Sequence, residues 1–100
     1  MGNSVQGIYT FNKYNGEEIN RYISLFSEKS GEEVRSMEMN CITLRRFSEN
    51  VNDNDDFKEY SPSIAIYTDG VVGKYNGRVI RLNDYLPNGE VVLSSWEVRG

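Results

Sequence analysis

The side chains that commonly carry out catalysis near neutral pH are scarce in this chain. It contains no histidine and a single cysteine, Cys41, which removes the commonest general base and the commonest zinc ligand. Arrangements of the Ser-His-Asp or Cys-His kind are therefore excluded within the chain. Carboxylates adjacent in sequence, such as Asp55 and Asp56, are typical of surface charge. We predict a protein that is not an enzyme and that has no cofactor and no bound metal.

The densest group of charged residues is the segment 49–59, with the sequence ENVNDNDDFKE. It holds five acids and one base, whereas the other 89 residues hold ten acids and ten bases, so the whole net charge of −4 lies in this segment. An EF-hand calcium loop needs glycine at its sixth position, and neither the register from Asn52 nor that from Asp53 provides it. The spacing therefore does not support a calcium loop of this type.

Three interpretations of the acidic segment remain open. It is a solvated loop over 48–62 that connects two elements, a surface that docks on a basic partner, or, as the least favoured alternative, an irregular calcium site. In the second case the carboxylates steer the approach and two aromatic rings anchor the contact. The predicted partner-binding residues are Asp53, Asp55, Asp56, Phe57, Glu59 and Tyr60.

A nucleic-acid-binding face is the alternative use of the charged residues. Two basic pairs, at 45–46 and at 78 and 81, lie near Phe47 and Tyr75 in the sequence, as in sheets that bind single strands. The acidic total charge argues against high affinity for phosphate backbones.

A hairpin is indicated by VVGKYNGRVIRL at 71–82, where Asn76-Gly77 separates two runs rich in β-branched residues. A two-residue turn pairs Tyr75 with Arg78, Gly73 with Ile80 and Val71 with Leu82, and glycine at 73 is consistent with a bulge. The tetrapeptide KYNG also occurs at 13–16. We expect the same turn chemistry at both places, without a duplicated element.

A helix is predicted for about 16–29, because four apolar residues there follow helical spacing. Asn15 is placed to cap this helix, Glu18 completes a capping box, and Gly31 follows as a stop. The same stretch is also good strand material, so a hairpin there is the alternative. The residues that form the apolar stripe are Ile19, Tyr22, Ile23 and Phe26.

The remaining apolar runs read as strands, at 5–12, 36–47, 63–68 and 90–99. The stretch 33–47 also fits a helix, and if it is a strand, Cys41 is a small buried core residue. We predict an α+β fold, with a bent antiparallel sheet of five or six strands and one helix packed on it. The alternative is a small all-β barrel.

Length and composition indicate one domain over 1–100. The lone cysteine and the lack of a secretory signal predict a cytoplasmic location, and no run is long and apolar enough to span a membrane. We expect a small acidic binding protein, an inhibitor or immunity-type partner of a basic protein. The alternatives are a nucleic-acid-binding module and a structural subunit that pairs sheet edges.

Overall fold

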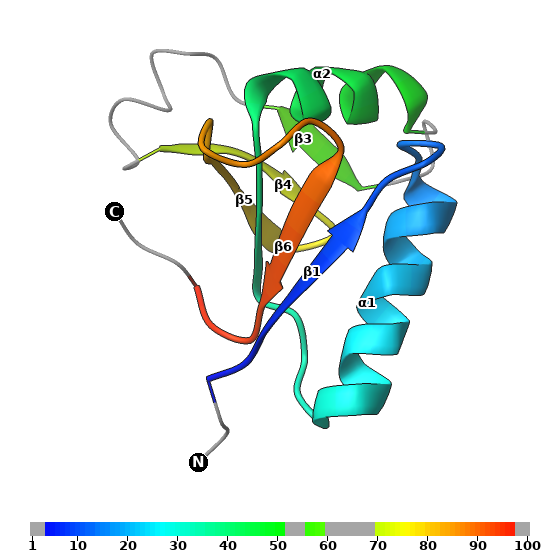
Figure 1. Ribbon diagram of the computed structural model, residues 1–100, viewed down its shortest axis with the longest axis vertical. Helices are drawn as coiled ribbons and strands as arrows, with labels where there is room; N and C mark the ends of the chain where they lie inside the picture. The colour runs from blue at the N-terminus through cyan, green and yellow to red at the C-terminus, as the bar shows by residue number, and fades with distance from the viewer. Residues whose placement is uncertain (1–3, 52–55, 60–69, 98–100) are drawn as a thin grey trace.

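The computed structural model describes residues 4–51, 56–59 and 70–97. Figure 1 shows α2 lying across one end of the sheet and α1 running alongside β1. The predicted strand at 63–68 lies outside the described residues. The elements are β1 (Gln6–Thr10), α1 (Gly16–Ser30), β2 (Ser36–Met39), α2 (Cys41–Asn50), β3 (Phe57–Glu59), β4 (Val71–Tyr75), β5 (Arg78–Leu82) and β6 (Glu90–Ser94).

The described strands form one open, mixed sheet in the order β1-β6-β2-β5-β4-β3. The β2–β5 pair is parallel and the other neighbours are antiparallel. Since β6 is antiparallel to both β1 and β2, these two strands run in the same direction, and α1 is the crossover between them. The α+β prediction is confirmed, with six strands, and the sheet is open where the alternative expected a barrel.

Helix α1 begins and ends where the sequence pattern predicts. The Asn15 side chain accepts a hydrogen bond from the Glu18 N–H at 2.9 Å, and Gly31 ends the helix in the left-handed conformation. Ile19, Ile23 and Phe26 are buried, as the apolar stripe requires. This N-terminus also corrects one expectation, because Asn15 is extended and caps the helix, so the first KYNG does not form the turn found at Asn76-Gly77.

Helix α2 replaces most of the strand predicted for 36–47, and it agrees in part with the helix that was the alternative for 33–47. Strand β2 stops at Met39, and Asn40 caps the new helix by accepting from the Thr43 N–H at 2.7 Å. Thr43, Leu44 and Phe47 then form its buried face. Cys41 is exposed at the first position of the helix, so its predicted burial on a strand is wrong.

The β4–β5 hairpin turns at Asn76-Gly77, both with positive φ, as the sequence predicts. Tyr75 pairs with Arg78 and Gly73 with Ile80, but Val71 pairs with Arg81 instead of Leu82. An irregularity between Val71 and Gly73 shifts the register, which is the bulge that glycine at 73 allows. A Cβ at Gly73 would collide with the Lys58 carbonyl of β3.

Phe47 connects the two ends of the sheet within the core. Its ring stacks on Phe11, just after β1, with centroids 5.6 Å apart. It also meets Phe57 of β3 edge-on at 5.4 Å and Tyr75 of β4 at 5.5 Å. The residue that follows β1 and a residue of β3, from the two opposite edges of the described sheet, therefore pack against the same ring of α2.

Candidate protein-binding edges of the sheet

The predicted acidic site lies partly in regular structure. Residues 48–50 belong to α2 and 57–59 form β3, so the segment 48–62 is not one continuous loop. Asp56 directly precedes β3 and is exposed, as are Lys58 and Glu59. The predicted contact residues Asp53, Asp55 and Tyr60 lie outside the described residues.

Phe57, the predicted anchor, is in contact with the core. Its side chain is half-buried and packs edge-on against the Phe47 ring. In the sheet, Phe57 pairs with Tyr75 of β4. The ring is thus held from the inside by aromatic contacts. Its role in a partner contact stays a prediction. The exposed charged groups at this end are of both signs, the carboxylates of Asp56 and Glu59 and the ammonium groups of Lys58 and its strand partner Lys74.

Strand β3 is one edge of the described sheet, and it is poorly suited to pairing with a further strand. It has three residues, two of which are the charged Lys58 and Glu59. Natural sheets protect their edges with short strands and charged side chains of this kind.

Strand β1, the opposite edge of the described sheet, turns part of its main chain outward. The Phe11 N–H donates to the Gly89 carbonyl at 2.8 Å, and the Ser95 N–H donates to the Val5 carbonyl at 3.0 Å. Because main-chain groups in an antiparallel pair alternate between partner and opposite side, the odd-numbered residues face β6. The N–H and C=O groups that point away from the sheet belong to Gln6, Ile8 and Thr10.

These outward groups are partly unused. In the described part of the chain, no hydrogen bond is made to the outward main-chain groups of Gln6 or Ile8. The Thr10 carbonyl, by contrast, accepts from the Tyr22 hydroxyl at 2.6 Å. Burial and the Glu18 carboxylate raise the pKa of Tyr22, which keeps this hydroxyl protonated as a donor. The free stretch of edge therefore runs from Gln6 to Ile8 and ends at Thr10.

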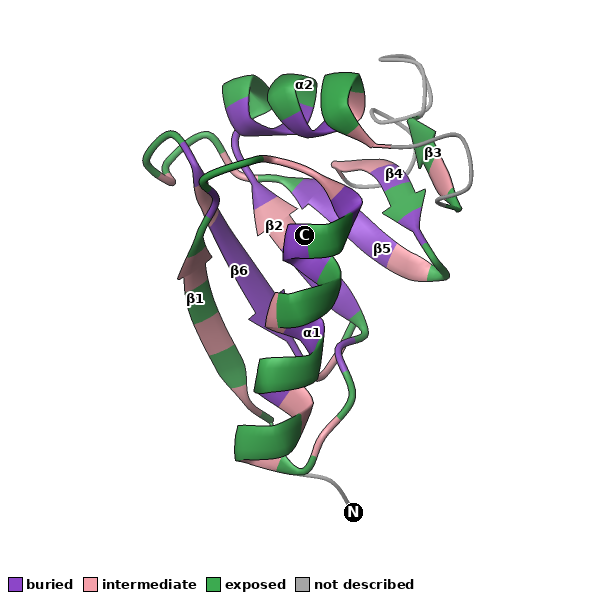
Figure 2. Ribbon diagram, turned by 90° about the vertical axis from the view of Figure 1, so that its right-hand side faces the viewer, coloured by how far each residue is buried: buried purple, intermediate pink, exposed green. Residues whose placement is uncertain are grey.

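The residue types of β1 include none of those that protect an edge strand from pairing with a further strand. The strand QGIYT has no charge and no proline, and Ile8 is 66% exposed. Figure 2 shows β1 banded between exposed and half-buried residues, while its neighbour β6 is buried almost throughout. An edge strand that lacks these protective features is open to strand addition.

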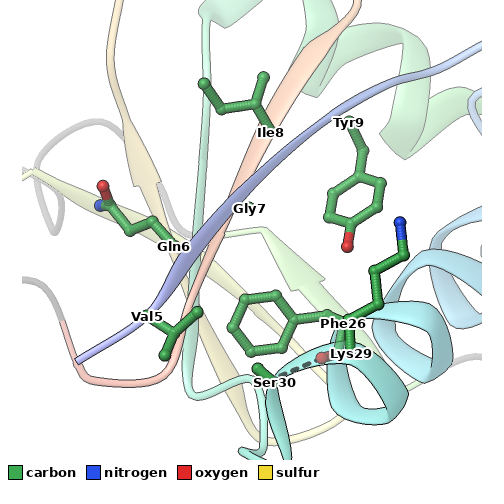
Figure 3. Close-up of a pocket in the computed structure, with 8 residues that line it drawn as sticks. All are labelled: Val5, Gln6, Gly7, Ile8, Tyr9, Phe26, Lys29 and Ser30. Atoms are coloured by element: carbon green, nitrogen blue, oxygen red, sulfur yellow. Dashed lines mark hydrogen bonds between the residues drawn. The ribbon is translucent and has the colours of Figure 1, made fainter. Parts of the chain in front are cut away.

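A groove of about 390 Å³ lies between β1 and α1. Figure 3 shows the Phe26 ring and the Lys29 side chain on its helix side, and Gln6 and Ile8 pointing to the opposite side of the strand. A Cβ at Gly7 would lie 2.9 Å from the Tyr9 ring, so glycine is needed for the close packing of this ring. The lining residues are Val5, Gln6, Gly7, Ile8, Tyr9, Phe26, Lys29 and Ser30.

This edge was missed as a site by reasoning from sequence. The run 5–12 is readable as a strand, but nothing in it indicates which side of the sheet it occupies. Its only available signal was the run of five uncharged residues at 6–10.

The arginines of the nucleic-acid alternative do not share an accessible aromatic face. Phe47 and Tyr75, which would have to stack on bases, are buried in the core. Arg81 is also buried, and the Arg46 guanidinium lies over the Tyr14 ring, 5.4 Å from its centroid.

Two further kinds of site are absent from the described residues. No cluster of three or more acidic, cysteine or histidine side chains is placed there to hold a metal ion. Neither helix in the described ranges has the length and apolar character to cross a membrane.

Comparisons with protein-family models, curated proteins and solved structures found no match to this chain.

Proposed function

We propose that this protein binds another protein by adding an extended segment of its partner to the sheet, as a new strand beside β1. The observation that carries the proposal is the outward main chain of Gln6 and Ile8, which has no partner among the described residues. Strand addition uses such groups directly, since each outward N–H and C=O pairs with the main chain of the incoming segment.

The arrangement around the edge supports this role. The main-chain hydrogen bonds provide affinity for any extended chain, and the groove beside α1 provides room for the side chains that select one. The partner would also cover Ile8, whose burial contributes about 1.5 to 3 kcal/mol when complete. Binding of this kind needs no histidine, metal or cofactor. It suits an inhibitor or immunity-type protein that occupies a segment of its target.

Replacing Ile8 with proline tests the proposal. The Ile8 N–H points away from β6, so its loss leaves the β1–β6 hydrogen bonds in place. The probe is a displayed library of random peptides about ten residues long, which exceeds the length of a usual strand. We expect the unmodified protein to enrich extended peptides, and Ile8→Pro to weaken their binding at least about tenfold, measured by calorimetry.

The matched control is Ile8→Val, which keeps the N–H and an apolar β-branched side chain. It should retain most of the binding, and circular dichroism should show that both variants are folded. Equal peptide binding by Ile8→Pro and the unmodified protein would contradict strand addition at β1.

A second candidate function is contact with a basic partner at the β3 end. It is favoured by the exposed carboxylates of Asp56 and Glu59, which lie at the edge opposite β1. Carboxylates at a rim act mainly on the rate of encounter.

A further inference from the structure

We infer that the segment captured by β1 carries an apolar side chain opposite Ile8 and an acidic side chain directly next to it in sequence, which pairs with Lys29. This inference rests on the proposed function, because it names the chemistry of the partner at the same edge.

The alternation of side chains determines which face each partner residue occupies. In β1 the side chains of Gln6 and Ile8 point away from α1, whereas Tyr9 points toward it and stacks on Tyr22, with centroids 5.0 Å apart. An added strand continues the same pleat. The partner residue opposite Ile8 therefore shares the face of Ile8, and its sequence neighbours point to the helix side.

On the Ile8 face an apolar partner residue is favoured. Ile8 is 66% exposed, and directly opposed side chains in neighbouring strands lie close enough to bury each other. A β-branched residue at that position would cover it with little loss of side-chain freedom.

On the helix side, Tyr22 stacks on Tyr9 of β1, and Phe26, Lys29 and Ser30 of α1 line the groove. Of the described residues that line the groove, Lys29 is the only charged one. Among the described residues Lys29 makes no ion pair. An acidic side chain that enters the groove would therefore find one cation beside apolar surface, where an ion pair is less screened than in open water.

The same observation argues against a second copy of this chain as the occupant. The residues from Val5 to Thr10 include no acid, so a paired β1 would offer nothing to Lys29. In antiparallel self-pairing about Ile8, Gln6 would also have to bond to Thr10, whose carbonyl already accepts from Tyr22. A segment of different sequence complements the groove better.

The test combines selection with a charge exchange. Peptides enriched from the displayed random library should share an apolar residue with an acid beside it. For one such peptide, we expect Lys29→Glu to weaken binding about fivefold. Replacing the peptide acid by lysine should restore binding to Lys29→Glu while weakening binding to the unmodified protein.

Two further variants keep the test decisive. Lys29→Gln removes the charge without repulsion near the C-terminal end of α1, and it should show a smaller loss in the same direction. Lys58→Glu makes the same charge change on β3, at the other edge, and should leave the peptide affinity unchanged.

The outcomes separate the inference from the proposed function. In one outcome Ile8→Pro abolishes peptide binding, but Lys29→Glu still binds the acidic peptide as well as the unmodified protein does and does not prefer the lysine peptide. Strand addition then stands and the assignment of Lys29 is wrong. If the unmodified protein enriches no peptide and is a dimer in light scattering that Ile8→Pro makes monomeric, the occupant is a second copy and the inference is overturned.

Discussion

Glu18 is a buried carboxylate that holds the segment between β1 and α1. Its oxygens accept from three consecutive main-chain N–H groups, those of Asn12 at 2.8 Å, Lys13 at 2.9 Å and Tyr14 at 3.0 Å. Burial by itself raises the pKa of Glu18, but the three main-chain hydrogen bonds and that from Tyr22 together leave it below the usual value. The contact differs from the predicted capping box, since the carboxylate accepts from the three residues before the cap instead of from the Asn15 N–H.

The lowered pKa of Glu18 makes stability depend on pH. The ionised carboxylate stabilises the fold at any pH above the unfolded-state pKa, and this contribution is lost as the pH falls through the folded-state value. We expect Glu18→Gln to cost about 2 kcal/mol at neutral pH, the range of a hydrogen bond to a charged group. Urea denaturation at several pH values measures both the loss and its disappearance in acid.

The control for this prediction is Glu17→Gln, an exposed neighbour in the same first turn of α1. It should change the free energy of unfolding by only a few tenths of a kcal/mol. An equal effect of the two variants would show that the helix dipole, and not the buried carboxylate, accounts for the pH dependence.

Among the elements, α2 has the largest structural role relative to its length. Its Phe47 is fully buried, and the ring contacts Phe11, Phe57 and Tyr75 from three different parts of the sheet. Asn40 fixes the start of the helix and also donates to the Leu86 carbonyl at 3.0 Å, in the connection between β5 and β6. The helix thus depends on contacts that are distant in sequence.

Removing the Phe47 ring should therefore weaken both edges of the described sheet at once. We expect Phe47→Ala to cost about 3 to 5 kcal/mol, as for other buried aromatic residues. Hydrogen exchange should accelerate in β1 and in β3, although these strands are at opposite ends of the sheet order. Ile42→Ala, on the exposed side of the same helix, is the control and should cost far less. Acceleration confined to β3 would mean that Phe47 does not join the two ends.

The two helices differ in how far local sequence signals predict them. In α1 the cap, the apolar stripe and the stop lie within one stretch of sequence, so local spacing was sufficient. In α2 the helix follows a strand after the single residue Asn40, and the apolar run 36–47 spans both elements. The partners that favour the turn at Asn40 come from the distant residues 86 and 88, which no local pattern contains.

At the scale of the whole molecule, the two edges of the described sheet differ in chemistry. The β1 edge is uncharged along the strand and is bordered by Lys29, whereas the β3 end carries exposed charges of both signs. These are the carboxylates of Asp56 and Glu59 and the ammonium groups of Lys58 and Lys74. The predicted basic partner and the proposed captured segment would thus use different ends of the protein.

The second candidate function can be tested by neutralising the acidic end. We expect the double variant Asp56→Asn, Glu59→Gln to slow association with an oligolysine peptide and to reduce its salt dependence, because these charges act on encounter. Stopped-flow measurements at several salt concentrations provide the rates. Affinity for peptides bound at β1 should not change.

Neutralising two exposed acids on α1, by Glu17→Gln with Glu28→Gln, produces the same change in net charge and serves as the control. If both double variants slow association equally, net charge alone accounts for the effect, and the β3 end is not a specific contact.

The sequence by itself determined the features that depend on neighbours along the chain. These are the α+β class, the helix α1 with its caps, and the hairpin at Asn76-Gly77, because periodicity, capping and turn residues act over a few positions. The charge of the acidic segment was also readable directly from its composition.

Only the tertiary structure decided which strands are neighbours and which surfaces remain open. Insertion of β6 between β1 and β2 leaves β1 at an edge, and the packing of α2 draws Phe57 against Phe47. Both outcomes depend on contacts between residues far apart in sequence, whose energies are set by the burial of shared apolar surface and not by local conformational preference. For this reason the uncharged strand at 6–10 could be read as a strand from its sequence, but its free main chain could not.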